Sequence, residues 1–169
     1  DVLEDERLVA LVRALVVDEV LPTLRPVRGL DYQDYLAQVL RRFRNPALRH
    51  ELAQIAWDGS QKLPIRLLGT VRDALASGGE VTRLCSTVAA WMHFVRCRTA
   101  AGTALVDPLA ERLARLAREH TNGESAHDVA AFLALEAVFP RELAALPAFQ
   151  VALERAYATL AANPGYRLT

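Results

Sequence analysis

The sequence predicts an all-α fold of seven or eight helices, on the strength of three observations. Alanine and leucine together supply 56 of the 169 residues, whereas the β-branched and aromatic residues that favour strands are sparse. Apolar residues recur at helical spacing along most of the chain. Asparagine, aspartate, glycine and proline interrupt these segments at positions typical of helix ends. Helix is therefore favoured over a β-sandwich or a parallel sheet.

The first two helices are delimited by proline and aspartate. Helical spacing predicts a first helix over residues 2–20, whose apolar stripe includes Glu19. This helix ends before Pro22, because the residue that precedes a proline is pushed out of the helical region. After a loop over residues 23–30, Asp31 can cap a second helix that runs through Phe43.

Two more helices come in the middle of the chain. The Asn45-Pro46 pair predicts a third helix that ends near Asp58, because asparagine is a good N-cap and proline suits the first helical position. Pro64 is then expected to open a fourth helix, which ends at a pair of glycines at positions 78 and 79.

The second half of the chain predicts the remaining helices. A long helix begins at Glu80, and further helices are expected over residues 107–121 and 148–162. Between these two, a helix capped by Ser125 or Asp128 is expected to run to residue 139. The long helix carries one buried face, formed by Leu84, Val88, Trp91, Met92 and Val95.

Length and composition point to a single domain over residues 1–169. With 52% hydrophobic and 24% charged residues, the chain can bury a sizeable core without disulfides or a metal. A net charge of zero argues against general binding to nucleic acid or to anionic membranes. No apolar run approaches the length of a membrane span, and the two cysteines lie inside one apolar helical pattern. A cytoplasmic protein is expected.

Motifs for several kinds of chemistry are missing. The sequence has no glycine-rich phosphate loop after a strand, so this chain is not expected to hold NAD or ATP by itself. His93 and Cys97 share the only metal-like helical offset, but no CxxC or HExxH accompanies them, and no metal is expected. Ser60 and Lys62 are one residue short of the S-x-x-K spacing, which does not support a serine hydrolase.

Lys62 is unusual because it is the single lysine in a chain with 19 arginines. It falls at the start of the predicted fourth helix, where the positive end of the helix dipole makes a cation cost about 0.3–1 kcal/mol. Lysine is a compact point charge on a thin stem, which suits contact with a carboxylate or hydroxyl in a tight cleft. A single lysine must also lie somewhere, so chance placement stays open.

Other polar residues cluster just before Lys62. Asn45 is explained as a helix cap, and Asp58 with the glycine after it as a turn, after which Ser60 caps the next helix. Gln54 and Asp58 lie four residues apart, which places them either on a solvated edge or on the wall of a polar cleft.

One long segment, RFRNPALRHELAQIAWDGSQKLPIR, resembles the signature of the C-terminal domain of the mannitol dehydrogenase family. That family comprises long-chain polyol dehydrogenases and hexuronate reductases. The resemblance continues into DEVLPTL before this segment and AAWMHFVRCRTAAGTALVDPLAERL after it, and it covers nearly the whole chain in order.

The resemblance implies half of a two-domain enzyme. In that family an N-terminal Rossmann domain binds NAD or NADP, and a helical C-terminal domain closes over a sugar alcohol, a ketose or a sugar acid. The family's catalytic K-x-x-x-x-N-x-x-H motif is not in this sequence, which begins with Asp1 rather than methionine. The chain is therefore expected to be a piece of a longer enzyme, to be inactive by itself, and to expose an apolar patch where the cofactor domain docks.

The resemblance also implies a substrate site around Lys62, which occupies the family's substrate-contacting basic position. Some members have an arginine at the position of Gln54, and its absence here brings the sequence closer to the hexuronate and bacterial hexitol branches. Asn45, His50 and Asp58 match the same block, where they either contact substrate or shape the loop. The implied reaction interconverts a polyol or hexonate with its ketose or keto-sugar acid, as in mannitol 2-dehydrogenase or fructuronate reductase.

Two other functions compete with this one. The absence of a complete catalytic set also fits a non-enzymatic helical interaction or ligand-binding module. The all-α pattern alone would also suit the ligand-binding half of a transcription regulator.

Overall fold

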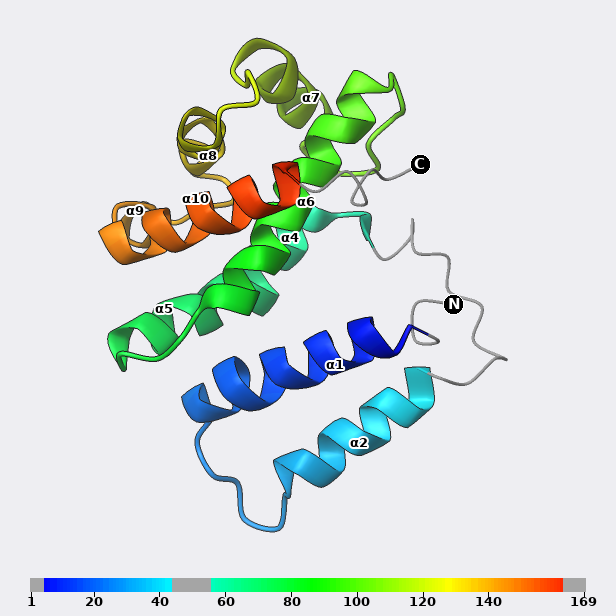
Figure 1. Ribbon diagram of the computed structural model, residues 1–169, viewed down its shortest axis with the longest axis vertical. Coiled ribbons are helices and arrows are strands. Elements are labelled where there is room, and N and C mark those ends of the chain that lie inside the picture. The colour runs from blue at the N-terminus through cyan, green and yellow to red at the C-terminus, as the bar shows by residue number, and fades with distance from the viewer. Residues whose placement is uncertain (1–4, 44–55, 163–169) are drawn as a thin grey trace.

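The computed structural model describes residues 5–43 and 56–162, and for Phe43 it describes the backbone alone. Regular structure within these residues is entirely helical, which confirms the all-α prediction (Figure 1). None of the described helices is long and apolar enough to cross a membrane. The elements in chain order are α1 (Glu6–Ala14), the π-helical η2 (Leu15–Val20), the 3-10 helix η3 (Leu21–Thr23), α2 (Tyr32–Phe43), α4 (Gly59–Leu63), the π-helical η4 (Pro64–Leu68), α5 (Gly69–Ala76), α6 (Thr82–Ala100), α7 (Ala110–Glu119), α8 (Ser125–Leu133), α9 (Arg141–Ala144) and α10 (Pro147–Ala161).

The core forms around α6, the longest helix. Its predicted apolar face is confirmed, since Leu84, Val88, Met92 and Val95 are buried and Trp91 packs against the core. α10 packs along α6 and also contacts α8, while α7 packs on another part of α6. Figure 1 shows α6 passing through the middle of the molecule with these helices around it. Burial of this apolar surface provides the main driving force for folding.

The first helix runs through Val20 with a π-helical last part, but the prediction that it ends before Pro22 is wrong. Leu21 stays in the helical region and the chain continues as η3 through Thr23, because Pro22 lies in the first turn of η3, where its missing N–H is not needed. Asp5 caps α1 by accepting a hydrogen bond from the N–H of Arg7 at 2.9 Å. η2 then places Glu19 in the interior, with 1% of its surface exposed, beside the first turn of α6. The second helix is confirmed as well, because the Asp31 carboxylate accepts hydrogen bonds from the N–H groups at positions 33 and 34.

The prediction that Pro64 opens the fourth helix is wrong. The helix begins at Gly59 and continues through Pro64 as η4 and then α5, up to Ala76. Proline lacks a donor N–H, and at Pro64 the chain passes from α-helical to π-helical pairing without ending the helix. The predicted third helix, from Asn45 onward, falls almost entirely outside the described residues.

The last part of the chain also differs from prediction in detail. α8 ends at Leu133 rather than near residue 139, and neither Ser125 nor Asp128 is its N-cap, which is Glu124. Asp128 is fully buried inside the helix, where its carboxylate accepts hydrogen bonds from the N–H groups of the turn at Asn122 and Gly123. The final helix, α10, matches its predicted bounds to within one residue at each end.

Candidate functional site

The predicted substrate site falls partly inside the structure. Asn45, His50 and Gln54 lie outside the described residues. Asp58 and Lys62 are described, and they are joined through the backbone, since the N–H of Lys62 donates to the Asp58 carbonyl at 2.9 Å. The segment from Asp58 to Lys62 therefore forms one turn that the rest of the domain positions.

Asp58 sets the direction of this turn. Its φ of 55° lies in the left-handed region, which aspartate tolerates better than most residues. Its N–H donates to the carbonyl of Val106 at 3.0 Å, and its carbonyl accepts from Gln61 and Lys62. Asp58 thus begins the turn and ties it to a segment almost fifty residues later.

Gly59 brings the turn against the core. A Cβ atom added at this position would overlap Nε1 and Cδ1 of Trp91, so only glycine fits. Trp91 is itself held edge-on against the ring of Phe132, with 5.9 Å between ring centroids. The indole of α6 therefore forms the support on which the turn rests.

Asp107 fixes the start of the helix that carries Lys62. Its carboxylate accepts hydrogen bonds from the Ser60 hydroxyl at 2.5 Å and from the Ser60 N–H at 2.9 Å. It also accepts from the N–H of Leu109 at 2.8 Å, just before α7. An acid at a helix N-terminus stabilises the orphan N–H groups and the dipole. The expectation that Ser60 caps the next helix is therefore wrong, because the capping group is Asp107 and Ser60 donates to it.

Lys62 ends the first turn of α4. Its side chain is half-buried, whereas those of its sequence neighbours Ser60 and Leu63 are buried. Lys62 lies near the N-terminus of the helix, where the positive end of the helix dipole makes a cation unfavourable. The carboxylate of Asp107 provides a negative charge at the same helix end. On the following turn Ile65 has 83% of its surface exposed and Arg66 is also exposed. The α4–η4 helix thus presents a cationic and apolar face away from the core.

A small cavity lies behind the turn. It has a volume of about 20 Å³, and Trp57, Trp91 and Val106 are among the residues that line it. That volume holds about one water molecule. The residues that support the turn, Trp91, Val106 and Asp107, are therefore closely packed against one another.

His93 and Cys97 form a separate pair on α6. The Sγ atom of Cys97 lies 3.3 Å from Nε2 of His93. Burial, and to a smaller extent Arg96, lowers the pKa of His93, so the neutral imidazole is favoured. Nowhere in residues 5–43 or 56–162 do three or more histidine, cysteine or acidic side chains gather as a metal site would require. This pair lacks the further ligands that a zinc centre needs.

Three acids have structural roles that sequence reasoning missed: Glu19 and Asp128, which are buried, and Asp107, which is half-buried. Asp128 accepts a hydrogen bond from the Tyr157 hydroxyl and pairs with Arg96, both at 3.0 Å. Burial is the main cause that raises the pKa of Tyr157, which keeps its hydroxyl protonated. The sequence carries one signal for such residues, since Glu19 lies on an otherwise apolar stripe, a position where a charged residue must find partners.

The chain is similar to known proteins over most of its length. The family described as the mannitol dehydrogenase C-terminal domain matches residues 1–161. The D-mannonate oxidoreductase of Escherichia coli is 39% identical over 149 residues, which cover 87% of this chain and 30% of that protein. A mannitol 2-dehydrogenase of Phaeosphaeria nodorum is 34% identical over 121 residues, which cover 70% of this chain and 21% of that protein.

A solved structure is also similar. It is the mannitol 2-dehydrogenase of Pseudomonas fluorescens in a ternary complex with NAD and D-mannitol, with a TM-score of 0.83 and 32% identity. The match covers 95% of this chain and 32% of the solved one, so this chain spans about a third of such relatives. The match to the family over residues 1–161 and the shared all-α fold show that the chain belongs to the mannitol dehydrogenase family and corresponds to its C-terminal domain.

Proposed function

We propose that this chain is the substrate-binding C-terminal domain of a longer NAD(P)-dependent oxidoreductase, which interconverts a polyol or a hexonate with its ketose or keto-sugar acid. The single observation that carries the proposal is the turn from Asp58 to Lys62, which the core holds from two sides and which presents one lysine. The names of the relatives, D-mannonate oxidoreductase and mannitol 2-dehydrogenase, support these two substrate classes.

Lys62 is proposed to bind a hydroxyl or carboxylate of the substrate at a distance from the reacting carbon. Its ammonium offers three donors, and its base is fixed because the backbone on both sides of it is helical and the turn is hydrogen-bonded to Asp107 and Val106. A fixed base lowers the entropy lost when the lysine orients a substrate. Asn45, His50 and Gln54, from the same sequence block, are proposed to complete the substrate site, and Asp58 to shape it.

The described residues do not fit a nicotinamide cofactor of the usual dinucleotide-binding kind. Such a site needs a strand and a glycine-rich turn before a helix, and residues 5–43 and 56–162 include no strand. We therefore place NAD or NADP in an N-terminal Rossmann domain of the longer enzyme. Ile65, exposed three residues after Lys62, is proposed to face that domain. The free thiols of Cys85 and Cys97 suit a cytoplasmic enzyme.

Substitution of Lys62 in the full-length enzyme tests the proposal. With mannitol, mannonate, fructuronate and tagaturonate as substrates and both nicotinamides as cofactors, Lys62→Ala is expected to lower kcat/KM on the true substrate by about tenfold or more. Lys62→Arg is expected to lose a similar factor, because a planar guanidinium does not replace a point charge in a tight site.

The matched control is Arg72→Ala, which removes an exposed cation ten residues later in the same run of helices. Its kinetic constants are expected to stay at the wild-type values. Circular dichroism of all three variants checks that they fold. Unchanged kinetics in Lys62→Ala on a substrate that the wild-type enzyme turns over would exclude Lys62 from the substrate site.

A further inference from the structure

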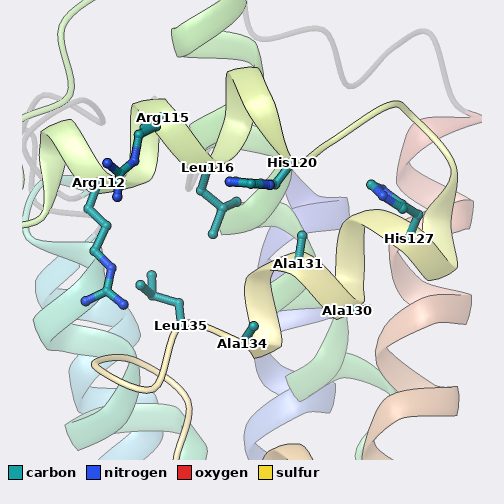
Figure 2. Close-up of a pocket in the computed structure, with 9 residues that line it drawn as sticks. All are labelled: Arg112, Arg115, Leu116, His120, His127, Ala130, Ala131, Ala134 and Leu135. Carbon is teal, nitrogen blue, oxygen red and sulfur yellow. The ribbon is translucent and has the colours of Figure 1, made fainter.

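A pocket lies between α7 and α8, and it shares no residue with the turn that carries Lys62. Its volume is about 430 Å³, within the usual range of small-molecule sites. Figure 2 shows α7 side chains on one side of the space and the alanines of α8 on the other. The lining residues are Arg112, Arg115, Leu116, His120, His127, Ala130, Ala131, Ala134 and Leu135.

The charge of this pocket is one-sided. Two guanidinium groups and two imidazoles line it, and no carboxylate is among its lining residues, although Nδ1 of His127 lies 3.7 Å from the buried carboxylate of Asp128. Across the described parts of the chain, the side chains of Arg112, Arg115 and His120 take part in no ion pair or hydrogen bond. Within these same parts, arginines at positions 72, 83, 96 and 141 pair with acids, whereas Arg112 and Arg115, like the exposed Arg66, Arg118 and Arg155, do not.

The floor of the pocket is apolar and formed by small residues. Ala130, Ala131 and Ala134 follow one another along α8 and its C-terminal end, and the buried side chains of Leu116 and Leu135 also line the pocket. Because alanine has no atoms beyond Cβ, these positions leave the hollow open, and any larger side chain there would fill part of it.

We propose that the α7–α8 pocket binds a small organic anion whose phosphate or carboxylate group contacts Arg112 and Arg115. Guanidinium groups bind both kinds of oxyanion through paired N–H donors, and such charge-assisted hydrogen bonds are about twice as strong as neutral ones. The two arginines lie one helical turn apart, where their like charges repel, and a bound anion would remove that repulsion. The rest of the ligand lies on the alanine floor.

Titration calorimetry on the full-length protein tests this site with two probes, pyrophosphate for phosphates and citrate for carboxylates. At least one is expected to bind with a Kd below about 1 mM. Arg112→Gln and Arg115→Gln are each expected to weaken that binding by about tenfold. Whether pyrophosphate or citrate binds more tightly assigns the class of anion.

Two further variants separate a built site from general charge. Ala130→Leu fills the pocket without changing its charge, and because residue 130 is exposed and leucine is a good helix former, the variant should fold and lose binding. Arg118→Gln removes a cation from the same helix outside this pocket and should bind as the wild type does.

Absence of binding by both probes up to about 10 mM would overturn the proposal. So would equal losses in Arg112→Gln and Arg118→Gln, which would show attraction to general positive charge, or full binding in Ala130→Leu. Lys62→Ala is expected to bind the probe with the Kd of the wild type. The two proposals can therefore fail separately: loss of the enzymatic role proposed for Lys62 would leave the anion site of the α7–α8 pocket untouched.

Discussion

Single side chains decide how the turn before Lys62 is placed. Gly59 is required because the indole of Trp91 occupies the space of a side chain, and Asp58 adopts the left-handed conformation that turns the chain into α4. Ser60 then donates its hydroxyl to Asp107. The sequence predicts a turn at Asp58 and Gly59 and a helix cap at Ser60. In the structure each of the three lies against a residue far away in the chain: Val106, Trp91 and Asp107, respectively.

Gly59→Ala is expected to destabilise the protein by about 1–3 kcal/mol, because its methyl group would overlap Trp91 and force the turn or the indole to move. Urea unfolding followed by circular dichroism measures the change. Gly69→Ala is the matched control, since a Cβ there meets nothing within 4 Å and the residue is helical. This control should be stabilised by about 0.4–1 kcal/mol. Equal stability of Gly59→Ala and the wild type would contradict the required close approach.

Helix starts in this domain are supported by acids from other elements. Glu19, on η2, accepts hydrogen bonds from the N–H groups of Arg83 and Leu84 at 2.8 Å and thereby caps α6. Asp107 does the same for α4. Because these partners lie 64 or 65 residues apart in one case and 47 in the other, local sequence rules cannot find them. This is why the predicted starts at Glu80 and Pro64 are displaced by two and five residues.

Glu19→Gln is expected to lower the free energy of unfolding by about 1–3 kcal/mol, because an amide replaces the buried carboxylate that accepts three hydrogen bonds from backbone N–H groups. The adjacent Asp18→Asn is the control. Its carboxylate is half-exposed and pairs with Arg83 at 3.3 Å, so its loss should cost about 0–1 kcal/mol. Chemical denaturation of both variants compares them, and equal effects would show that the cap does not stabilise α6.

At the scale of the whole molecule, the packed core lies apart from the residues proposed to bind substrate. Buried side chains from α6, α7, α8 and α10 form one core, while Lys62 and Ile65 lie on the helix that follows the turn. The burial of Cys85 inside this core raises its pKa to about 12, so the thiol stays protonated and packs as an apolar group. Among the described residues, no hydrogen bond connects the Cys85 thiol or the His93 imidazole to the turn from Asp58 to Lys62.

The isolated 169-residue chain is expected to fold and yet to show no oxidation or reduction with NAD or NADP, because its described residues provide no dinucleotide-binding unit. The measurement is nicotinamide absorbance with mannitol, mannonate and fructuronate, with the full-length enzyme as the positive control. Turnover by the isolated chain, at a rate that Lys62→Ala abolishes, would refute the proposed division between two domains.

The sequence by itself determined the helical class, the second and last helices, the buried face of α6 and the family, because these depend on local spacing and on one contiguous block of residues. The tertiary structure alone decided where α4 and α6 begin, why Gly59 has no side chain, and which acids are buried. The physical reason is that a helix terminus and a buried charge each need a partner, and here those partners come from distant parts of the chain.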